Sequence, residues 1–545
     1  MTSRLTSAVA GVTFLIVAGL SVAIFAGLAI GGGAQPLLLA DPGGLVRYGL
    51  PIATAVVHLG AALSIGSLMV AAMVVSASYR GFSQSLIVAA LGAGVTTVAS
   101  LLSGFLTFLA IYVEPVSLDQ RFGDVLWLYI QETEVGRAWL ITVGLSAIVT
   151  VLALAVRSFT GVFATGLLAV ASLWPLAEQG HASGTANHEA AVSASYVHSV
   201  FAAMWIGGLA MMAIIAWSNK PSPGEFHTML QRYSTIALVS FLVVAISGVT
   251  NAWLRVGEIQ GMFSAYGALV AAKTLTLLAL GLFGVAYRGR LLRSLVRGKR
   301  STSAVTLRVI AAELALMGVA SGLASALART QTPVAQVPAS QLSQSTPAEI
   351  LTGEALPPEF HWSNILVLWE LDLLWALLVV FGIVYYLWGH VRLARRGDSW
   401  PLGRTIVWVA GLLLLGFTTN SGLAVYGTYL FSVHMVAHML LSMAIPVLLV
   451  LGAPVTLASR AIVARKDGSR GPREWILAAV HSRYLSVLGH PVVAAAIFGV
   501  SLIVFYYSPL FEWALTEHLG HQWMIFHFVA TGYLFAQSLV GIDPS

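Results

Sequence analysis

The stretch AVAGVTFLIVAGLSVAIFAGLAI, residues Ala8 to Ile30, indicates the class of fold. It contains no charged side chain, and as a helix it is long enough to cross a hydrocarbon core of about 30 Å. Similar apolar runs of about 20 residues recur from here to the end of the chain. Inside a bilayer, backbone polar groups are satisfied within helices, so this repetition predicts an all-α membrane protein. We interpret Ala8 to Ile30 as a retained first span and not as a cleaved signal peptide.

The composition supports this class. Of the 545 residues, 58% are apolar and only 9% are charged, whereas an ordinary globular protein has about 25% charged residues. The chain contains no cysteine, which excludes disulfides, thiolate metal sites and CxxC redox chemistry. The net charge of +6 is spread over loops too short to form a basic domain, so no nucleic acid partner is predicted.

The apolar runs and their flanks predict about fourteen transmembrane helices in two bundles. Basic residues gather in alternate loops, most densely from Arg288 to Arg300, and this pattern places the N-terminus in the cytoplasm. A segment rich in Pro, Ser, Thr and Gln, residues 328–360, is predicted to be an extracytoplasmic linker. It separates residues 1–327, with about nine helices, from residues 361–545, with about five. The abrupt end after the last span indicates a C-terminal domain that is incomplete at residue 545.

The most specific local pattern is His434-Met435-Val436-Ala437-His438-Met439. On a helix His434 and His438 share one face, so both imidazoles can point at one ion. Imidazole suits copper, zinc, iron and nickel, and the nearby thioether groups favour Cu(I). The alternative is a pair of structural histidines hydrogen-bonded to other helices, with methionines that fill gaps in the core.

Two further groups of histidines are predicted on the outer side of the membrane. The first is the stretch Glu517 to His527, in which His521 and His527 are candidate additional ligands to the ion at His434 and His438. The second is in the N-terminal half, where His181 and His188 precede His198, with His58 in an earlier span. Intramembrane ionisable groups are functional candidates by default. The first group could supply the remaining ligands or a relay for the ion, and the second indicates a metal entrance with a separate site. The alternatives are an interfacial turn for the first group and a solvated loop for the second.

The sequence lacks the motifs that several classes of enzyme require. It has no P-loop, no HExxH and no GxSxG, and CxxCH haem attachment is impossible without cysteine. We therefore predict that the chain is not an enzyme. Haem b held by two histidines from different helices remains an alternative, with His58, His198, His434 or His527 as axial ligands.

The His434 to Leu441 segment resembles the CtaG family of cytochrome c oxidase assembly factors. Other short segments carry the same resemblance: Ile445-Pro446, Leu451 to Pro454, His490 to Ala494, Ser508 to Glu512, Gly520 to His527 and Gly541 to Pro544. Residues from about Gly44 to Leu327 resemble the copper resistance protein D family, CopD, through the His58 span, the stretch His198 to Gly208, and Lys273.

These resemblances imply copper handling at the plasma membrane. We expect a multi-pass protein that transports copper, or acts as a metallochaperone that delivers it for cytochrome c oxidase assembly. The expected partners are a copper ion, favoured as Cu(I), and a haem-copper oxidase subunit or an extracytoplasmic copper chaperone. A haem b electron-transfer protein is the alternative function.

Overall fold

The computed structural model of the chain describes residues 3–112, 116–117, 119–179, 188–286, 300–334, 346–352 and 356–543. Within these ranges, 13 helices are long and apolar enough to cross a membrane. The number rises to 14 if Pro491–Tyr506 and Leu510–Thr516, which are bent by 70°, form one broken span. The prediction of an all-α polytopic membrane protein is confirmed, and the cytoplasmic position of the N-terminus stays a prediction.

The chain divides into two compact units. The first contains Met1–Ser183, Ala194–Gln336 and Asp467–Ser469. The second contains Gly184–Ser193, Val337–Lys466 and Arg470–Ser545. The chain leaves the first unit within the predicted linker, 328–360, and the predicted domain limits themselves stay a prediction.

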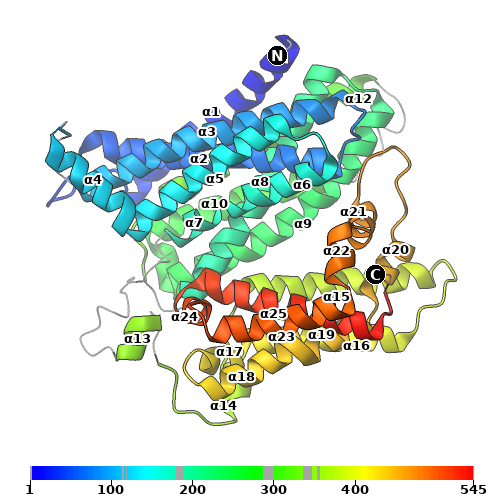
Figure 1. Cartoon of the computed structure of the whole chain (residues 1–545). Helices are drawn as coiled ribbons and strands as arrows, with labels where there is room; N and C mark the ends of the chain where they lie inside the picture. The colour runs from blue at the N-terminus through cyan, green and yellow to red at the C-terminus, as the bar shows by residue number, and fades with distance from the viewer. Residues whose placement is uncertain are drawn as a thin grey trace. The chain divides into compact units, whose positions relative to one another are not determined.

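The first unit, shown in blue to green in Figure 1, consists mainly of long helices. Its described helices are α1 (Ser3–Gly31), α2 (Gly43–Met73), α3 (Arg80–Ile111), α4 (Gln120–Glu132), α5 (Glu134–Ala155), α6 (Phe159–Ala171), α7 (Trp174–Glu178), α8 (His188–Asn219, whose first residues belong to the second unit), α9 (Pro223–Val256), the 3₁₀-helix η1 (Ile259–Phe263), α10 (Ala265–Ala286) and α12 (Arg300–Leu327).

Glycines allow these helices to pack closely. A Cβ atom built on Gly207 of α8 would lie 1.7 Å from the carbonyl oxygen of Ala62 in α2. A Cβ atom on Gly19 of α1 would lie 2.2 Å from the carbonyl oxygen of Ala315 in α12. Lipid offers no hydrophobic drive for helix association, so close backbone packing through small residues stabilises such pairs.

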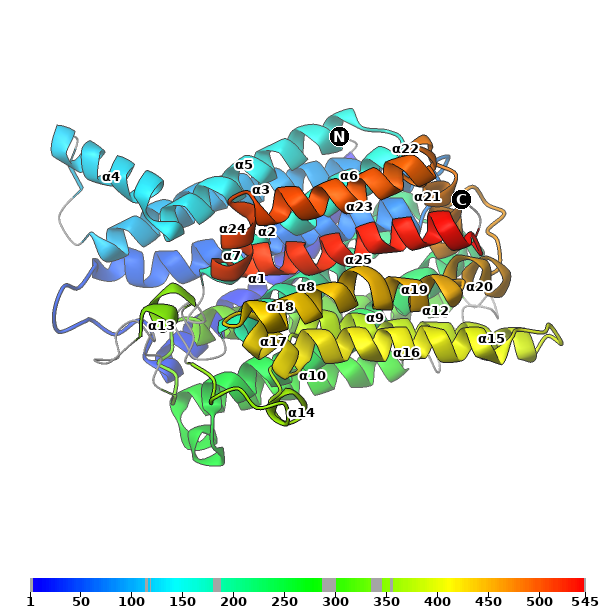
Figure 2. The same ribbon diagram turned by 60° about the horizontal axis from the view of Figure 1, so that its bottom comes forward.

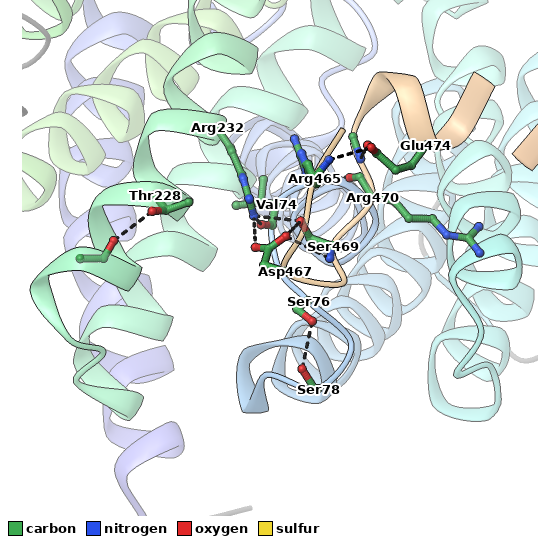
Figure 3. Close-up of polar contacts among 12 residues, drawn as sticks. Val74, Ser76, Ser78, Thr228, Arg232, Arg465, Asp467, Ser469, Arg470 and Glu474 are labelled. Atoms are coloured by element: carbon green, nitrogen blue, oxygen red, sulfur yellow. Dashed lines mark hydrogen bonds and ion pairs between the residues drawn. The ribbon is translucent and has the colours of Figure 1, made fainter. Parts of the chain in front are cut away.

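Arg232 of α9 holds the tripeptide Asp467–Ser469 within the first unit (Figure 3). Its Nη1 atom donates to the carbonyl oxygen of Val74 at 3.0 Å, to Oδ2 of Asp467 at 2.8 Å and to Oγ of Ser469 at 2.9 Å. Burial alone would raise the pKa of Asp467, but the hydrogen bonds from Arg232 and Ser469 hold that pKa below its usual value. The ionised carboxylate therefore stabilises this contact above the ordinary Asp pKa, and the contribution is lost as the pH falls through the lowered pKa.

Replacing Asp467 by asparagine is expected to speed trypsin cleavage around residues 465–470 about two- to fivefold at neutral pH. The reason is that a partly exposed ion pair contributes about 0.5 to 1 kcal/mol, and cleavage follows local opening of the segment. The rate is measured by timed digestion of the purified chain. Asp398→Asn, at an exposed carboxylate with no ion pair among the described residues, serves as the control. Equal rates for Asp467→Asn and the unmodified chain would contradict this role.

The second unit contains shorter and more often broken helices. They are α13 (Pro347–Thr352), α14 (Asn364–Val367), α15 (Leu373–Ala394), α16 (Leu402–Asn420), α17 (Gly422–Gly427), α18 (Phe431–Met439), the π-helix η4 (Leu440–Ala444), α19 (Ile445–Leu451), α20 (Pro454–Ala461), α21 (Pro472–Val480), α22 (Arg483–Leu488), α23 (Pro491–Tyr506), α24 (Leu510–Thr516) and α25 (His518–Val540). Their shared core includes Trp375, Leu412, Ile445, Phe505 and Phe528.

The end of the described chain returns to α20. Asp543 is 5% exposed, and its carboxylate accepts hydrogen bonds from the backbone N–H groups of Val455 at 3.0 Å and Thr456 at 2.8 Å. These groups are in the first turn of α20, where N–H groups have no partner within the helix. Ala453, which precedes α20, has no side-chain group that could cap this helix. The carboxylate of Asp543 caps it instead.

Candidate metal centre

The span that carries His434 and His438 is not a regular α-helix. α18 ends at Met439, and the π-helix η4 follows before α19 begins. Pro446 accounts for the irregularity, because it has no N–H to donate to the carbonyl of Ser442 four residues earlier. Ser442 in turn donates from Oγ to the carbonyl oxygen of His438 at 2.8 Å. Such π-turns are frequent at functional sites, and this one fixes the backbone immediately after the histidine pair.

Both histidines point into the second unit. His434 is 6% exposed and His438 is 2% exposed. The Nε2 atom of His434 is hydrogen-bonded to the hydroxyl of Tyr506 in α23 at 3.1 Å. The ring of His438 lies edge-on to Phe528 of α25, with 3.9 Å between ring centroids. Figure 2 shows α18, α23 and α25 side by side. The predicted shared face exists, and it is turned towards other helices.

His438 has two buried ring nitrogens without a hydrogen-bond partner. A buried polar group left unsatisfied costs about 1–3 kcal/mol, so in native proteins such a group usually meets an ordered water, an ion or another ligand. Nε2 of His527 in α25 is in the same situation. These unpaired nitrogens are the strongest indication in the structure of a position for a ligand.

A cavity of about 30 Å³ lies beside the histidine pair. That volume exceeds the roughly 10–15 Å³ needed for one water molecule, so it also accommodates a single metal ion. His434, His438, His521 and Met524 line it, together with Thr418, Thr419, Leu423, Ala424, Gly427, Thr428, Ala437, Leu441, Leu515, Ile525 and Phe528. No carboxylate is among the lining residues, so the groups that could bind a metal ion here are neutral imidazole, thioether, hydroxyl and backbone groups.

The two candidates for a third ligand have different surroundings. His521 lines the cavity, whereas His527 is not among the lining residues and stacks on Trp523, with 4.8 Å between ring centroids. Among the described residues, no group of three or more His, Asp or Glu side chains lies close enough to hold a metal. A three-histidine site is therefore not preformed, and the predicted set of ligands stays a prediction.

A polar network borders this centre. Gln522, the neighbour of His521, donates from Nε2 to Asp372 and accepts from Nε1 of Trp375 at 2.7 Å. Asp372 also caps α15, and its own N–H donates to Oδ1 of Asn420 at 2.8 Å. Burial raises the pKa of Asp372, while the hydrogen bond from Gln522 opposes the rise.

The structure thus joins Asp372 to Gln522. Tyr506, Gln522 and Phe528 were not predicted as neighbours of the histidine pair. Gln522 was the only one with a sequence signal, because a polar residue within an apolar span usually has a partner.

The N-terminal candidates are only partly described. His181 lies outside the described residues, and His188 is the first residue of α8, with no described side chain. His198 of α8 is hydrogen-bonded through Nδ1 to Oγ of Ser247 in α9 at 3.0 Å. His58 and Lys273 lie near enough to His198 to interact with it electrostatically. The first unit thus brings His58 and His198 into one region together with a lysine, and a metal site there stays a prediction.

Haem ligation at His434 stays a prediction, although the ring of His434 is closely surrounded by other rings. Phe431 and Phe511 pack against the ring of His434, with centroids at 6.2 and 5.2 Å. Haem ligation by His58 and His198 stays an untested alternative.

Comparisons with known families agree with both resemblances. Residues 384–545 match the family described as cytochrome c oxidase caa3 assembly factor. Residues 227–327 match copper resistance protein D, and residues 45–192 match the copper resistance protein D-like N-terminal domain. The two predicted resemblances are therefore confirmed, in the predicted order along the chain. Neither description names an enzyme, and the absence of enzymatic activity stays a prediction.

Curated relatives come from mycobacteria. An uncharacterized protein of Mycobacterium leprae is 43% identical over 198 residues, which cover 36% of this chain and 30% of that protein. Uncharacterized proteins of Mycobacterium bovis and Mycobacterium tuberculosis are each 43% identical over 197 residues, with the same coverage. The chain thus spans less than a third of the length of these relatives. No solved structure matches the chain.

Proposed function

We propose that this membrane protein binds Cu(I) at His434 and His438 and delivers it for the assembly of a haem-copper oxidase. The observation that carries the proposal is His438, whose two unpaired ring nitrogens are buried beside a cavity of about 30 Å³. The match of this unit to an oxidase assembly family supports the same role.

The donors favour a monovalent soft ion. The lining includes three histidines and one methionine and no carboxylate, whereas Ca²⁺ and Mg²⁺ require oxygen ligands. Zinc sites use three or four protein ligands, and no such group is preformed among the described residues. Burying a divalent ion among neutral ligands also costs more than burying a monovalent one, because the desolvation energy rises with the square of the charge. Imidazole with thioether suits Cu(I).

Tyr506 and Asp372 have supporting roles in this proposal. The hydroxyl of Tyr506 is hydrogen-bonded to Nε2 of His434. An ion that binds to this nitrogen must therefore break that hydrogen bond. Asp372, tied to Gln522 beside His521, places a carboxyl group outside the cavity, where its charge attracts cations. His58 and His198 form a second candidate copper-binding site, in the first unit.

The purified full chain is expected to lose one bound Cu(I) when His434 and His438 are both replaced by alanine. The measurement is a titration under reducing conditions against a competing Cu(I) chelator, with copper counted per chain. His481→Ala combined with His490→Ala is the matched control, since both histidines are exposed. A double variant at 434 and 438 with undiminished copper would place the site elsewhere. Loss of copper binding in the double variant with no change in oxidase assembly in cells would contradict the delivery role.

A further inference from the structure

An arginine cluster surrounds Trp400 at the end of the second unit where α15 ends and α16 begins. The indole of Trp400 is 9% exposed, and its Nε1 donates to the hydroxyl of Tyr386 at 3.2 Å. The guanidinium carbons of Arg404 and Arg460 lie 5.2 and 5.9 Å from the centroid of this ring. Arg396 reaches the same place, donating from Nη1 to the carbonyl oxygen of Arg460 at 3.4 Å.

These three arginines come from three helix ends. Arg396 follows α15, Arg404 is in the first turn of α16, and Arg460 is in the last turn of α20. Within the described part of the chain, none of them forms an ion pair with a carboxylate. Asp398 is in the same loop and is exposed, and it does not pair with them. Gathering like charges around one indole is unfavourable unless an anion joins them.

We propose that Arg396, Arg404 and Arg460 bind the phosphate group of an anionic phospholipid. Arginine presents a planar set of donors that matches phosphate in a bidentate manner. Trp400 holds two of the guanidinium groups in place, so little side-chain freedom is lost on binding.

The position of the cluster favours a lipid over a soluble anion. α15 and α16 are both candidate membrane spans, so the loop between them lies at a membrane surface. Tryptophan is enriched at that depth, beside the phosphate layer, and a second arginine–tryptophan pair, Arg392 over Trp388 at 4.9 Å, flanks the cluster. Clusters of basic residues next to a span are typical of anionic lipid recognition.

The test compares lipid binding by native mass spectrometry of the full chain. Phosphatidylglycerol is titrated against Arg404→Gln combined with Arg460→Gln, and its affinity is expected to fall about 30-fold, since each basic residue near the surface contributes about fivefold. The control, Lys466→Gln combined with Arg483→Gln, removes two exposed charges of the same unit and is expected to bind as the unmodified chain does. Phosphatidylcholine is expected to bind weakly to all forms.

The outcomes separate the alternatives and do not depend on copper. Equal affinity for phosphatidylglycerol in the glutamine variant and the unmodified chain would overturn the site. Displacement of the lipid by millimolar inorganic phosphate alone would identify a soluble-anion site and overturn the lipid assignment. If the glutamine variant does not fold, Arg404→Lys with Arg460→Lys carries the test. That variant keeps both charges, and we expect intermediate affinity because lysine lacks the bidentate fork; full affinity would overturn the role of the two guanidinium groups.

Discussion

Replacing Gly207 by alanine is expected to prevent the first unit from packing. The added Cβ atom would lie 1.7 Å from the carbonyl oxygen of Ala62 and 3.1 Å from Cα of Gly66. Backbone atoms of a helix cannot rotate away as a side chain does, so α2 and α8 must separate. Overpacking of this kind costs about 3 kcal/mol or more. The expected result is loss of the monodisperse peak in size-exclusion chromatography and a lowered unfolding temperature.

Gly144→Ala is the matched control for this prediction. Gly144 is in α5 of the same unit, and a Cβ atom there meets nothing within 4 Å. Alanine is the better helix former, so this variant is expected to be neutral or more stable by up to about 1 kcal/mol. A Gly207→Ala chain as stable as Gly144→Ala would show that the close crossing of α2 and α8 does not hold in the membrane.

The sequence did not predict this crossing. Gly66 and Gly207 are partners across one helix pair in the structure. Apolar runs predict that helices exist because spanning a bilayer requires them. They do not predict which helices meet, because lipid and helix interface are equally apolar.

At the candidate metal centre, too, the sequence predicts the local structure but not the contacts between helices. The spacing of His434 and His438 correctly predicted a shared face, since helix periodicity is a local property, while ligation of an ion by this pair stays a prediction. The groups that complete the surroundings, Tyr506, Gln522 and Phe528, come from α23 and α25. Their contribution depends on tertiary packing, so spacing within one segment does not reveal it. Likewise, only the structure shows that His521 lines the cavity and that His527 does not.

Copper affinity at the centre is expected to fall at least tenfold when Gly532 is replaced by alanine, although Gly532 does not line the cavity. A Cβ atom at this position of α25 would lie 2.1 Å from the carbonyl oxygen of Ser442 in η4 and 2.8 Å from Cγ of Pro446. α25 must then move away from η4. The same helix carries His521 and Met524 into the cavity, so their distance from His438 increases.

Gly499→Ala separates this effect from a general loss of helix packing. Gly499 is in α23, next to α25 in the same unit, and a Cβ atom there meets nothing within 4 Å. Its copper affinity, from the same chelator titration, is expected to equal that of the unmodified chain. Full affinity in Gly532→Ala, with α25 still folded, would mean that ligands from α25 are not needed and that His434 and His438 suffice alone. Loss of affinity in Gly532→Ala only would show that Cu(I) is held between the histidines of α18 and ligands of α25, because Gly532 sets the distance of α25 from the turn that follows α18.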